Sequence, residues 1–194
     1  MKIIDAPQYG PMFRFTDASV YWSLYVLSDG KRMGRKRLAD EAGVGEGSMR
    51  RILNTLKDNN FVDIKQTGIT ITKAGLAYLS ELPIRVIDVD ASKIVLGDYS
   101  QAVMVRGASK QIDNGLQQRD AGIRAGALGC TTLVMRDGEL ILPPDWSIDK
   151  NEPEVAEHIK EVSNMVDDDI IIIGSADNKT SAINAALSAA FELF

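Results

Sequence analysis

This chain of 194 residues has one cysteine, Cys130, and one histidine, His158. A single cysteine excludes a disulfide within the chain and fits a reducing cytoplasm. A structural zinc site needs four cysteine or histidine ligands, so these two residues cannot build one. The sequence has no cofactor fingerprint and no marked carboxylate cluster, and we expect neither a metal nor a cofactor. His158 lies on a predicted polar helix and is expected at the surface.

Long apolar runs are also missing. None approaches the roughly 20 residues that a helix needs to cross a bilayer, and the beginning MKIIDAPQYGPMFRF lacks the apolar segment of a signal peptide. We therefore expect a cytoplasmic protein with no membrane partner. Pro7, Gly10 and Pro11 predict an irregular arm over residues 1–15. With 45% hydrophobic and 25% charged residues, the chain has the composition of a globular protein.

The most informative pattern lies within residues 34–72. A short helix is predicted over residues 35–42, and it ends at Gly43, which can adopt the left-handed conformation that reverses a chain. A second helix is predicted over residues 46–59, with Gly45 at its N-cap. Two helices joined by such a turn form a helix-turn-helix, in which the second helix enters the DNA major groove.

The second helix has two different faces. Its apolar residues recur at the spacing of one helical face and are expected in the core; they are Met49, Ile52, Leu53 and Leu56. The opposite face suits DNA, because small residues near a helix start allow close approach and arginines reach guanine edges or phosphates. That face consists of Gly47, Ser48, Arg50, Arg51 and Asn54.

Two runs rich in β-branched residues follow, residues 61–65 and 69–72. They flank Gln66-Thr67-Gly68 and predict a hairpin that serves as the wing of a winged helix. The helix face, the wing and the start of the first helix together give the predicted DNA-binding residues. These are Arg35, Lys36, Gly47, Ser48, Arg50, Arg51, Asn54, Lys57, Lys65 and Gln66.

The run LADEAGV, followed by SMRR and LK, resembles the winged helix of bacterial and archaeal transcription regulators, including the DeoR-type and glycolytic-gene-regulator groups. Residues 12–82 as a whole resemble the N-terminal half of small archaeal regulators that carry a compact C-terminal domain. The resemblance implies binding to double-stranded operator DNA as a homodimer. The run Gly45-Glu46-Gly47 departs from the pattern, because many relatives carry Ser or Thr at the cap position.

Cations are concentrated in the first part of the chain, although the whole chain has a net charge of −5. Residues 1–82 contain 12 Lys and Arg against 9 Asp and Glu, whereas residues 83–194 contain 10 against 18. Phosphate binding needs local rather than net positive charge, so this distribution favours DNA binding. A run of charges is also typical of a solvated surface, and winged helices also serve as RNA-binding or protein-interaction modules.

Pro83 marks the predicted boundary between a winged-helix domain, residues 1–82, and a second domain, residues 83–194. Helices are also predicted over residues 18–27, capped by Asp17, and 73–82. The second domain mixes strands and helices, which predicts an α+β fold whose C-terminal part is a small α/β sandwich-like domain. Its predicted strands are residues 85–89, 94–96, 101–105, 131–135, 140–142 and 169–173, and its predicted helices are 112–127, 153–165 and 179–193.

Two strand-to-helix transitions in the second domain are candidate ligand sites, residues 105–110 and 173–181. A glycine after a buried strand lets backbone N–H groups approach a ligand, and a helix N-terminus favours an anion. Alternatively, these loops are turns in which Asp and Asn cap helices. The predicted ligand-binding residues, which suit a small anionic metabolite, are Arg106, Lys110, Arg119, Asp120, Arg124, Ser175, Asn178, Lys179 and Thr180.

Gly122, Gly126 and Gly129 lie in or near a predicted helix, where each interior glycine costs roughly 0.5–1 kcal/mol relative to alanine. They indicate close backbone packing or the approach of a ligand. The last helix either buries a self-complementary face in a two-fold dimer or covers the sheet of its own domain. That face consists of Ile183, Leu187, Ala190 and Phe191.

The sequence therefore favours a sequence-specific DNA-binding transcription regulator whose second domain dimerises, senses a small metabolite, or both. One alternative is a ligand-independent architectural or RNA-binding protein. Another is a small metabolic enzyme with an autoregulatory DNA-binding domain. The sequence contains no nucleophile–base pair, metal cluster or cofactor fingerprint, so we do not expect an enzyme.

Overall fold

The computed structural model describes residues 15–194. The predicted arm, apart from Phe15, lies outside the described residues. The chain divides into two compact units, the first ending at Leu82 and the second comprising Pro83–Phe194. We describe each unit by itself. Among the described residues, no helix is long and apolar enough to cross a membrane.

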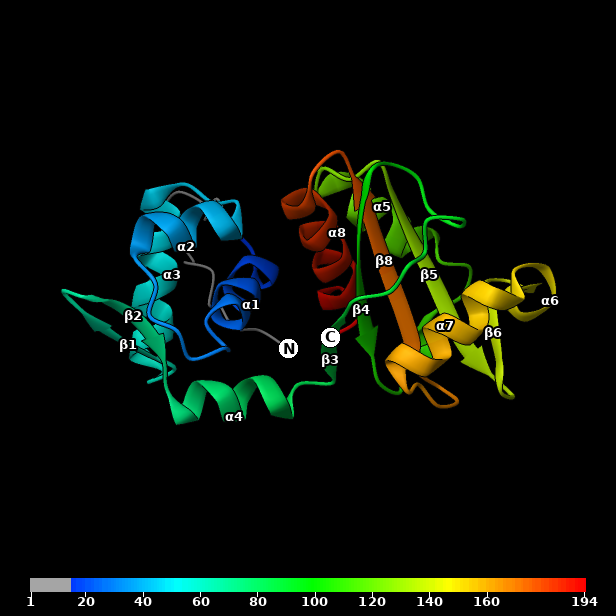
Figure 1. Ribbon diagram of the computed structural model, residues 1–194, viewed down its shortest axis with the longest axis horizontal. Helices are drawn as coiled ribbons and strands as arrows, with labels where there is room; N and C mark the ends of the chain where they lie inside the picture. The colour runs from blue at the N-terminus through cyan, green and yellow to red at the C-terminus, as the bar shows by residue number, and fades with distance from the viewer. Residues whose placement is uncertain (1–14) are drawn as a thin grey trace. The chain divides into compact units, whose positions relative to one another are not determined.

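The first unit has four helices and a hairpin in its described part (Figure 1). They are α1 (Asp17–Val26), α2 (Arg35–Ala42), α3 (Glu46–Asp58), β1 (Val62–Lys65), β2 (Gly68–Ile71) and α4 (Lys73–Glu81). The turn between α2 and α3 is as predicted, because Gly43 has φ 65° and Gly45 is the N-cap of α3. The predicted stripe of α3 is fully buried, with Met49 and Ile52 at 0% exposure.

The start of α1 differs from the sequence prediction. Asp17 is the first residue of the helix rather than its cap, and Thr16 is the N-cap. The Thr16 hydroxyl accepts a hydrogen bond from the Ser19 backbone N–H, while the Ser19 hydroxyl accepts one from the Thr16 backbone N–H. Two otherwise unpaired donors are thereby satisfied, and the Asp17 carboxylate lies in the first turn, where the helix dipole favours negative charge.

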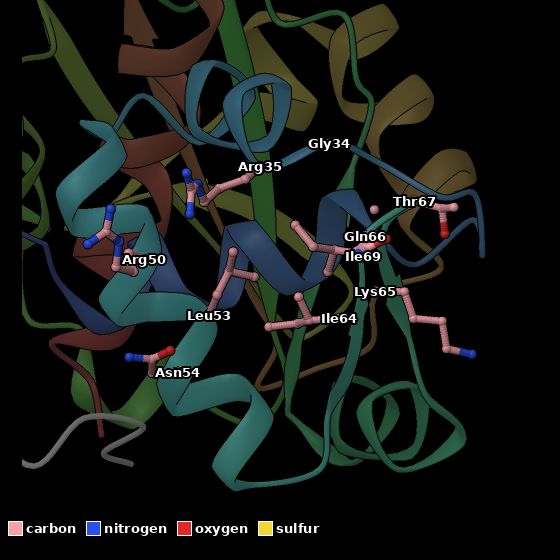
Figure 2. A pocket seen from close by; sticks show the side chains of 11 residues that line it. Gly34, Arg35, Arg50, Leu53, Asn54, Ile64, Lys65, Gln66, Thr67 and Ile69 are labelled. Atoms are coloured by element: carbon pink, nitrogen blue, oxygen red, sulfur yellow. The ribbon is translucent and has the colours of Figure 1, made fainter.

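The hairpin has a shorter turn than predicted. Lys65 pairs with Gly68, so only Gln66 and Thr67 form the tip, and Gly68 belongs to β2 (Figure 2). Gly68 has φ 127°, and a Cβ on it would lie 2.9 Å from the Met33 carbonyl oxygen. The close approach arises because Met33 forms two backbone hydrogen bonds with Ile69, of 2.9 and 2.8 Å. The segment that leads into α2 is thus joined to the hairpin.

The second unit is built on a six-stranded sheet in the order β3-β4-β8-β5-β6-β7 (Figure 1). Every neighbouring pair of strands is antiparallel. Its strands are β3 (Ile84–Ile87), β4 (Tyr99–Val105), β5 (Gly129–Arg136), β6 (Glu139–Leu142), β7 (Trp146–Ser147) and β8 (Ile170–Ala176). Its helices are η1 (Ser109–Gln111), α5 (Leu116–Arg124), α6 (Ile148–Asn151), α7 (Pro153–Ser163) and α8 (Lys179–Phe191).

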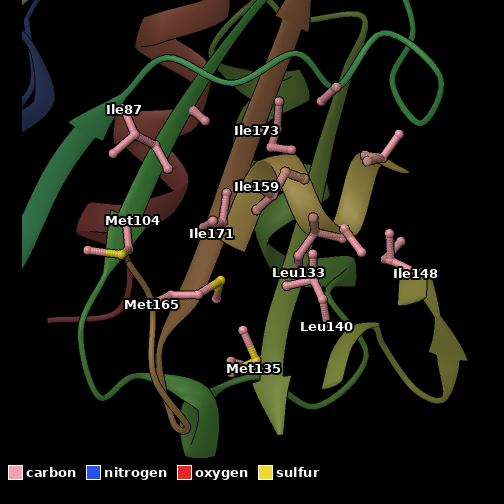
Figure 3. Packing of buried hydrophobic residues seen from close by; sticks show 14 residues of the cluster. Ile87, Met104, Leu133, Met135, Leu140, Ile148, Ile159, Met165, Ile171 and Ile173 are labelled. Atoms are coloured by element: carbon pink, nitrogen blue, oxygen red, sulfur yellow. The ribbon is translucent and has the colours of Figure 1, made fainter. Parts of the chain in front are cut away.

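Helices cover both faces of this sheet, and strand alternation assigns the side chains to them. Ile171 and Ile173 of β8 face a cluster that includes Ile159 of α7 and residues of β4 and β5 (Figure 3). The opposite face packs against α8 and α5. Every residue of β8 is buried, as predicted for its apolar run. The predicted hairpin turn at Asp137-Gly138 is also confirmed, because both residues have positive φ and join β5 to β6.

Three predicted elements of the second unit are wrong in kind or in extent. Residues 94–96 form a turn rather than a strand. The helix predicted over residues 112–127 is only Leu116–Arg124, because Gly115 with φ 74° precedes it. Asp169 lies before β8, and its buried carboxylate accepts hydrogen bonds from the Gly107 and Val166 backbone N–H groups. These two backbone donors give the buried carboxylate the hydrogen-bond partners that burial requires, so Asp169 need not belong to the strand.

Candidate nucleic-acid interface

The polar side of α3 lies opposite its buried stripe. Gly47, Arg50, Arg51 and Asn54 are exposed, while Ser48 is half-buried. The surface is therefore accessible within the chain, as a reading surface must be. Arg50 and Asn54 are one helical turn apart, so their side chains emerge from the same side of the helix.

A groove of about 350 Å³ separates α3 from the hairpin (Figure 2). We call it the α3–wing groove, and its lining residues are Gly34, Arg35, Arg50, Leu53, Asn54, Ile64, Lys65, Gln66, Thr67, Gly68 and Ile69. Three of these residues are cations and none is a carboxylate. An anionic partner is therefore favoured over a cationic one.

Half of the predicted DNA-binding residues come together in this groove, namely Arg35, Arg50, Asn54, Lys65 and Gln66. The others, Lys36, Gly47, Ser48, Arg51 and Lys57, do not line it. Sequence reasoning missed Ile64, which is 38% exposed. The sequence carries no signal for this exposure, because Ile64 follows the buried Val62 by two residues and shares its face of the strand.

The cations of the interface differ in how they are paired. Among the described residues, neither Arg35 nor Arg50 has a hydrogen-bond or ion-pair partner, and the same holds for Asn54. Lys65, by contrast, forms an exposed ion pair with Asp63 at 3.0 Å. An exposed pair of this kind contributes about 0–1 kcal/mol, so it holds Lys65 only weakly. Arg50 and Asn54 have their full hydrogen-bonding capacity available for a partner.

Arg32 is a second residue that the sequence did not single out. Its guanidinium donates a hydrogen bond to the Thr67 hydroxyl at the tip of the hairpin. The Met33–Ile69 backbone pair lies beside it. Together these contacts join the segment before α2 to the wing.

Three glycines on this side of the unit have open space beside them, and two of these, Gly34 and Gly45, are N-caps, where glycine is favoured over alanine. A Cβ on Gly34, Gly45 or Gly47 would meet no atom within 4 Å, and none of the three has a positive φ. Glycine inside a helix is destabilising by roughly 0.5–1 kcal/mol relative to alanine, so the fold itself would favour alanine at Gly47. A surface kept free of side chains at this cost is typical of close approach by a partner.

We expect Gly47→Ala to raise the free energy of unfolding by about 0.5 kcal/mol, because alanine restricts the unfolded chain and no atom obstructs its methyl group. The same substitution should weaken DNA binding, because the methyl group separates α3 from the base edges. Thermal unfolding and DNA titration measure the two effects separately. A variant that is both more stable and binds DNA equally well would contradict close approach at Gly47.

The predicted ligand-binding residues of the second unit are not brought together. Strands β4 and β8 are antiparallel, with Val105 opposite Ile170 and Tyr99 opposite Ala176. The loop with Arg106 and Lys110 therefore lies at one end of the sheet, and the residues that follow β8 lie at the other. With 3.4 Å per residue, seven paired residues separate the two ends by roughly 20 Å.

Most of these residues also have local roles. Arg119 forms an exposed pair with its neighbour Asp120 at 3.1 Å, and Arg124 pairs with Glu192 at 2.6 Å. Asn178 caps α8 by accepting a hydrogen bond from the Ser181 backbone N–H at 2.9 Å. Ser175 is buried and donates to the Gly129 carbonyl oxygen. Lys179 and Thr180 form the first turn of α8.

Gly174, Gly122 and Gly129 are closely packed, whereas Gly126 has φ 95° and no atom within 4 Å of an added Cβ. Gly174 lies inside β8, where a Cβ would come within 2.1 Å of the Ala182 carbonyl oxygen of α8. A Cβ on Gly122 would lie 2.5 Å from the Cys130 side chain. Burial of that side chain raises the pKa of the Cys130 thiol to about 12. At Gly174 and Gly122 the glycine is therefore explained by close packing rather than by the approach of a ligand.

Two further sequence expectations change. Ile183, Leu187 and Ala190 of α8 are buried at 3% exposure or less and the fourth residue of that face, Phe191, is half-buried, so of the two alternatives the face covers the sheet of its own domain. His158 is half-buried rather than free at the surface. Its Nε2 accepts a hydrogen bond from the Asp90 backbone N–H at 3.1 Å, beside a hollow of about 210 Å³.

Comparisons with known proteins agree with this division of the chain. A family model described as the CggR N-terminal DNA binding domain matches residues 21–85, and one described as a domain of unknown function, DUF4443, matches residues 96–193. The solved structure of a hypothetical protein from Pyrococcus horikoshii OT3 is 25% identical, with a TM-score of 0.71 and 93% of each chain covered. No protein with a curated description matches. The predicted resemblance to a DNA-binding regulator with a compact second domain is confirmed.

Proposed function

Because the chain belongs to the DUF4443 family and carries a DNA-binding domain ahead of that family's domain, we propose that it is a sequence-specific transcription regulator. The DNA-binding domain itself indicates a DNA-binding regulator. The finer proposal is that α3 reads base edges in the major groove while the wing contacts the sugar–phosphate backbone.

One observation carries this proposal most directly. Arg50 and Asn54 project from one side of α3, and neither is paired with any described residue. Arginine makes bidentate hydrogen bonds to guanine, and asparagine does so to adenine. Side chains one helical turn apart are separated by about 5–6 Å, which fits bases one or two steps of about 3.4 Å apart along a strand. We therefore expect a guanine and an adenine close together in each half-site.

The second unit is proposed to act by dimerisation, by binding a small anionic metabolite, or by both, without a catalytic step. A dimer is supported by the exposed apolar side chains of Leu96 and Leu128, whose exposures are 69% and 49%. Leu128 and Leu96 lie close to Gly97 and Gly129 respectively, so the two leucines belong to one patch. Patches of this kind mark interaction surfaces.

Selection of bound genomic fragments by the purified protein tests the proposal. We expect recovery of a pseudo-palindromic sequence with half-sites one helical turn apart, bound with a Kd of about 10⁻⁸–10⁻¹¹ M at physiological salt. The bound complex should contain two copies of the chain by light scattering. Equal binding to all fragments, or tighter binding to single-stranded RNA, would contradict a sequence-specific regulator.

For the metabolite, a panel of small anions scored by thermal shift is the direct measurement. A ligand present at 100 times its Kd stabilises the protein by about 2.7 kcal/mol. A regulator further requires that this ligand change DNA affinity, typically through 1–3 kcal/mol of coupling. A ligand that stabilises the protein and leaves DNA affinity unchanged would exclude it as the effector.

A further inference from the structure

The floor of the α3–wing groove is apolar, which simple phosphate binding does not require. It is formed by Leu53 of α3 together with Ile64 and Ile69 of the hairpin. Leu53 and Ile69 are 3% and 2% exposed because they belong to the core, whereas Ile64 is 38% exposed. Ile64 pairs with Ile69 across the hairpin and lies on the same face of β1 as the buried Val62. Its side chain therefore lies in the groove next to Leu53 (Figure 2).

Polar groups flank this floor. Arg35 stands at the start of α2, and Gln66 stands at the tip of the hairpin. The lining contains no carboxylate, and Arg35 has no partner among the described residues. An apolar strip between anion-binding groups matches a chain in which apolar and anionic units alternate. The sugar–phosphate backbone of a nucleic acid is such a chain.

We propose that the α3–wing groove holds the backbone of one DNA strand, and that Ile64 packs against a deoxyribose and discriminates it from ribose. The inference rests on the proposed DNA-binding function and assigns separate roles to the residues of the groove. Arg35 and Gln66 take the phosphates on either side of that sugar, as such side chains commonly do. Arg50 and Asn54, on the helix side of the groove, remain available for base edges.

The discrimination follows from the chemistry of the sugar. A deoxyribose presents a CH₂ group at C2′, whereas a ribose presents a hydroxyl that donates and accepts hydrogen bonds. Against Ile64 and Leu53 that hydroxyl would lose its water and gain only carbon neighbours. An unsatisfied buried polar group weakens an interaction by about 1–3 kcal/mol, which corresponds to roughly 5- to 150-fold in affinity.

A ribonucleotide scan of the selected duplex tests the proposal. Each deoxynucleotide of the half-site is replaced singly by its ribonucleotide, and the Kd of the full-length protein is measured. We expect a loss of about tenfold at one or two positions for the wild type. Ile64→Thr offers a hydroxyl partner in a side chain of similar shape, and it should reduce the loss at those positions to less than about threefold. Ile64→Val keeps an apolar side chain at this position, so the tenfold loss of affinity should remain.

The comparison between variants separates this contact from changes in the duplex itself. A ribonucleotide that only alters helix geometry weakens all three proteins equally, and that result would overturn the proposal. Replacing each thymine by deoxyuridine removes only a methyl group. If this replacement, and not the ribonucleotide, distinguishes wild type from Ile64→Thr, Ile64 contacts a base, and the sugar assignment is wrong.

The scan also distinguishes failure of the inference from failure of the proposed function. A protein that binds its selected duplex but shows a flat ribonucleotide scan refutes the role of Ile64 and leaves DNA reading intact. A protein that selects no duplex refutes the function on which the inference rests. Thermal unfolding of Ile64→Thr and Ile64→Val verifies that both fold, which their exposed position leads us to expect.

Discussion

Replacing Gly174 with alanine is expected to lower the free energy of unfolding of the second unit by about 3 kcal/mol or more. The added Cβ would lie 2.1 Å from the Ala182 carbonyl oxygen and 2.8 Å from the Ala186 backbone nitrogen, both in α8. These obstructing atoms are backbone, so no rotation of a side chain relieves the clash. Either α8 moves away from β8 or the central strand is displaced, and both changes open the core on that face.

The chain offers a matched control and a local probe for this experiment. Gly107 lies in the same unit with φ 64° and no atom within 4 Å of an added Cβ, so Gly107→Ala introduces only backbone strain. That strain amounts to roughly 1–2 kcal/mol. The chain has two tryptophans. In a Trp22→Phe background, Trp146 fluorescence reports denaturant unfolding of the second unit. If Gly174→Ala destabilised less than Gly107→Ala, the close packing of α8 on β8 would be wrong.

Arg50→Ala is expected to weaken binding to the selected operator by about 1–3 kcal/mol and to relax the preference at one base pair. The reason is that Arg50 is exposed on α3 and unpaired among the described residues, so its hydrogen bonds are available for a guanine edge. Binding to unrelated DNA should change much less. Titrations of the operator and of its variants at each half-site position measure both effects.

Two cation substitutions serve as controls for Arg50. Lys65→Ala removes a wing cation that is already paired with Asp63, and it should weaken binding to all sequences about equally, with a salt slope shallower by about 1. Arg85→Ala removes an exposed cation of the second unit and should leave binding unchanged. If Arg50→Ala, Arg51→Ala and Lys65→Ala all bind the operator as the wild type does, α3 does not read the DNA major groove.

The helix-turn-helix was predictable because its determinants are local. Gly43 ends α2 in a left-handed conformation, and the spacing of Met49 and Ile52 places the buried side of α3. Such features depend on residues within one or two turns of each other, so a sequence displays them directly. The hairpin was predicted for the same reason, although its tip is one residue shorter than expected because Gly68 pairs with Lys65.

The candidate ligand site could not be placed from the sequence because it depends on strand direction. The predicted alternation of strands and helices suggested that the loops at residues 105–110 and 173–181 are neighbours. Every pair of adjacent strands in the second unit is antiparallel instead. Arg106 and Lys179 consequently lie at opposite ends of the sheet. Gly174 was misjudged in a similar way, because the strand continues through it to Ala176 and only the packing of α8 explains the glycine.

The apolar part of the DNA interface escaped prediction for a different reason. Ile64 carries no charge and follows the alternation of a strand that buries Val62, so the sequence alone assigns it to the core. In the structure Ile64 is instead 38% exposed and lines the α3–wing groove. Arg32 was missed because its partner Thr67 is 35 residues away in the chain.

The position of β8 in the sheet has a consequence for how the protein matures on the ribosome. This strand is the last of the eight in chain order, yet it joins β4 to β5. Until residues 170–176 emerge, two strands bear open edges, and such edges promote aggregation. The first unit does not contain this strand and is available earlier, since domains generally form as units during synthesis. The sheet of the second unit can therefore be completed only once β8 has joined it, and folding intermediates without β8 are the ones most prone to aggregate.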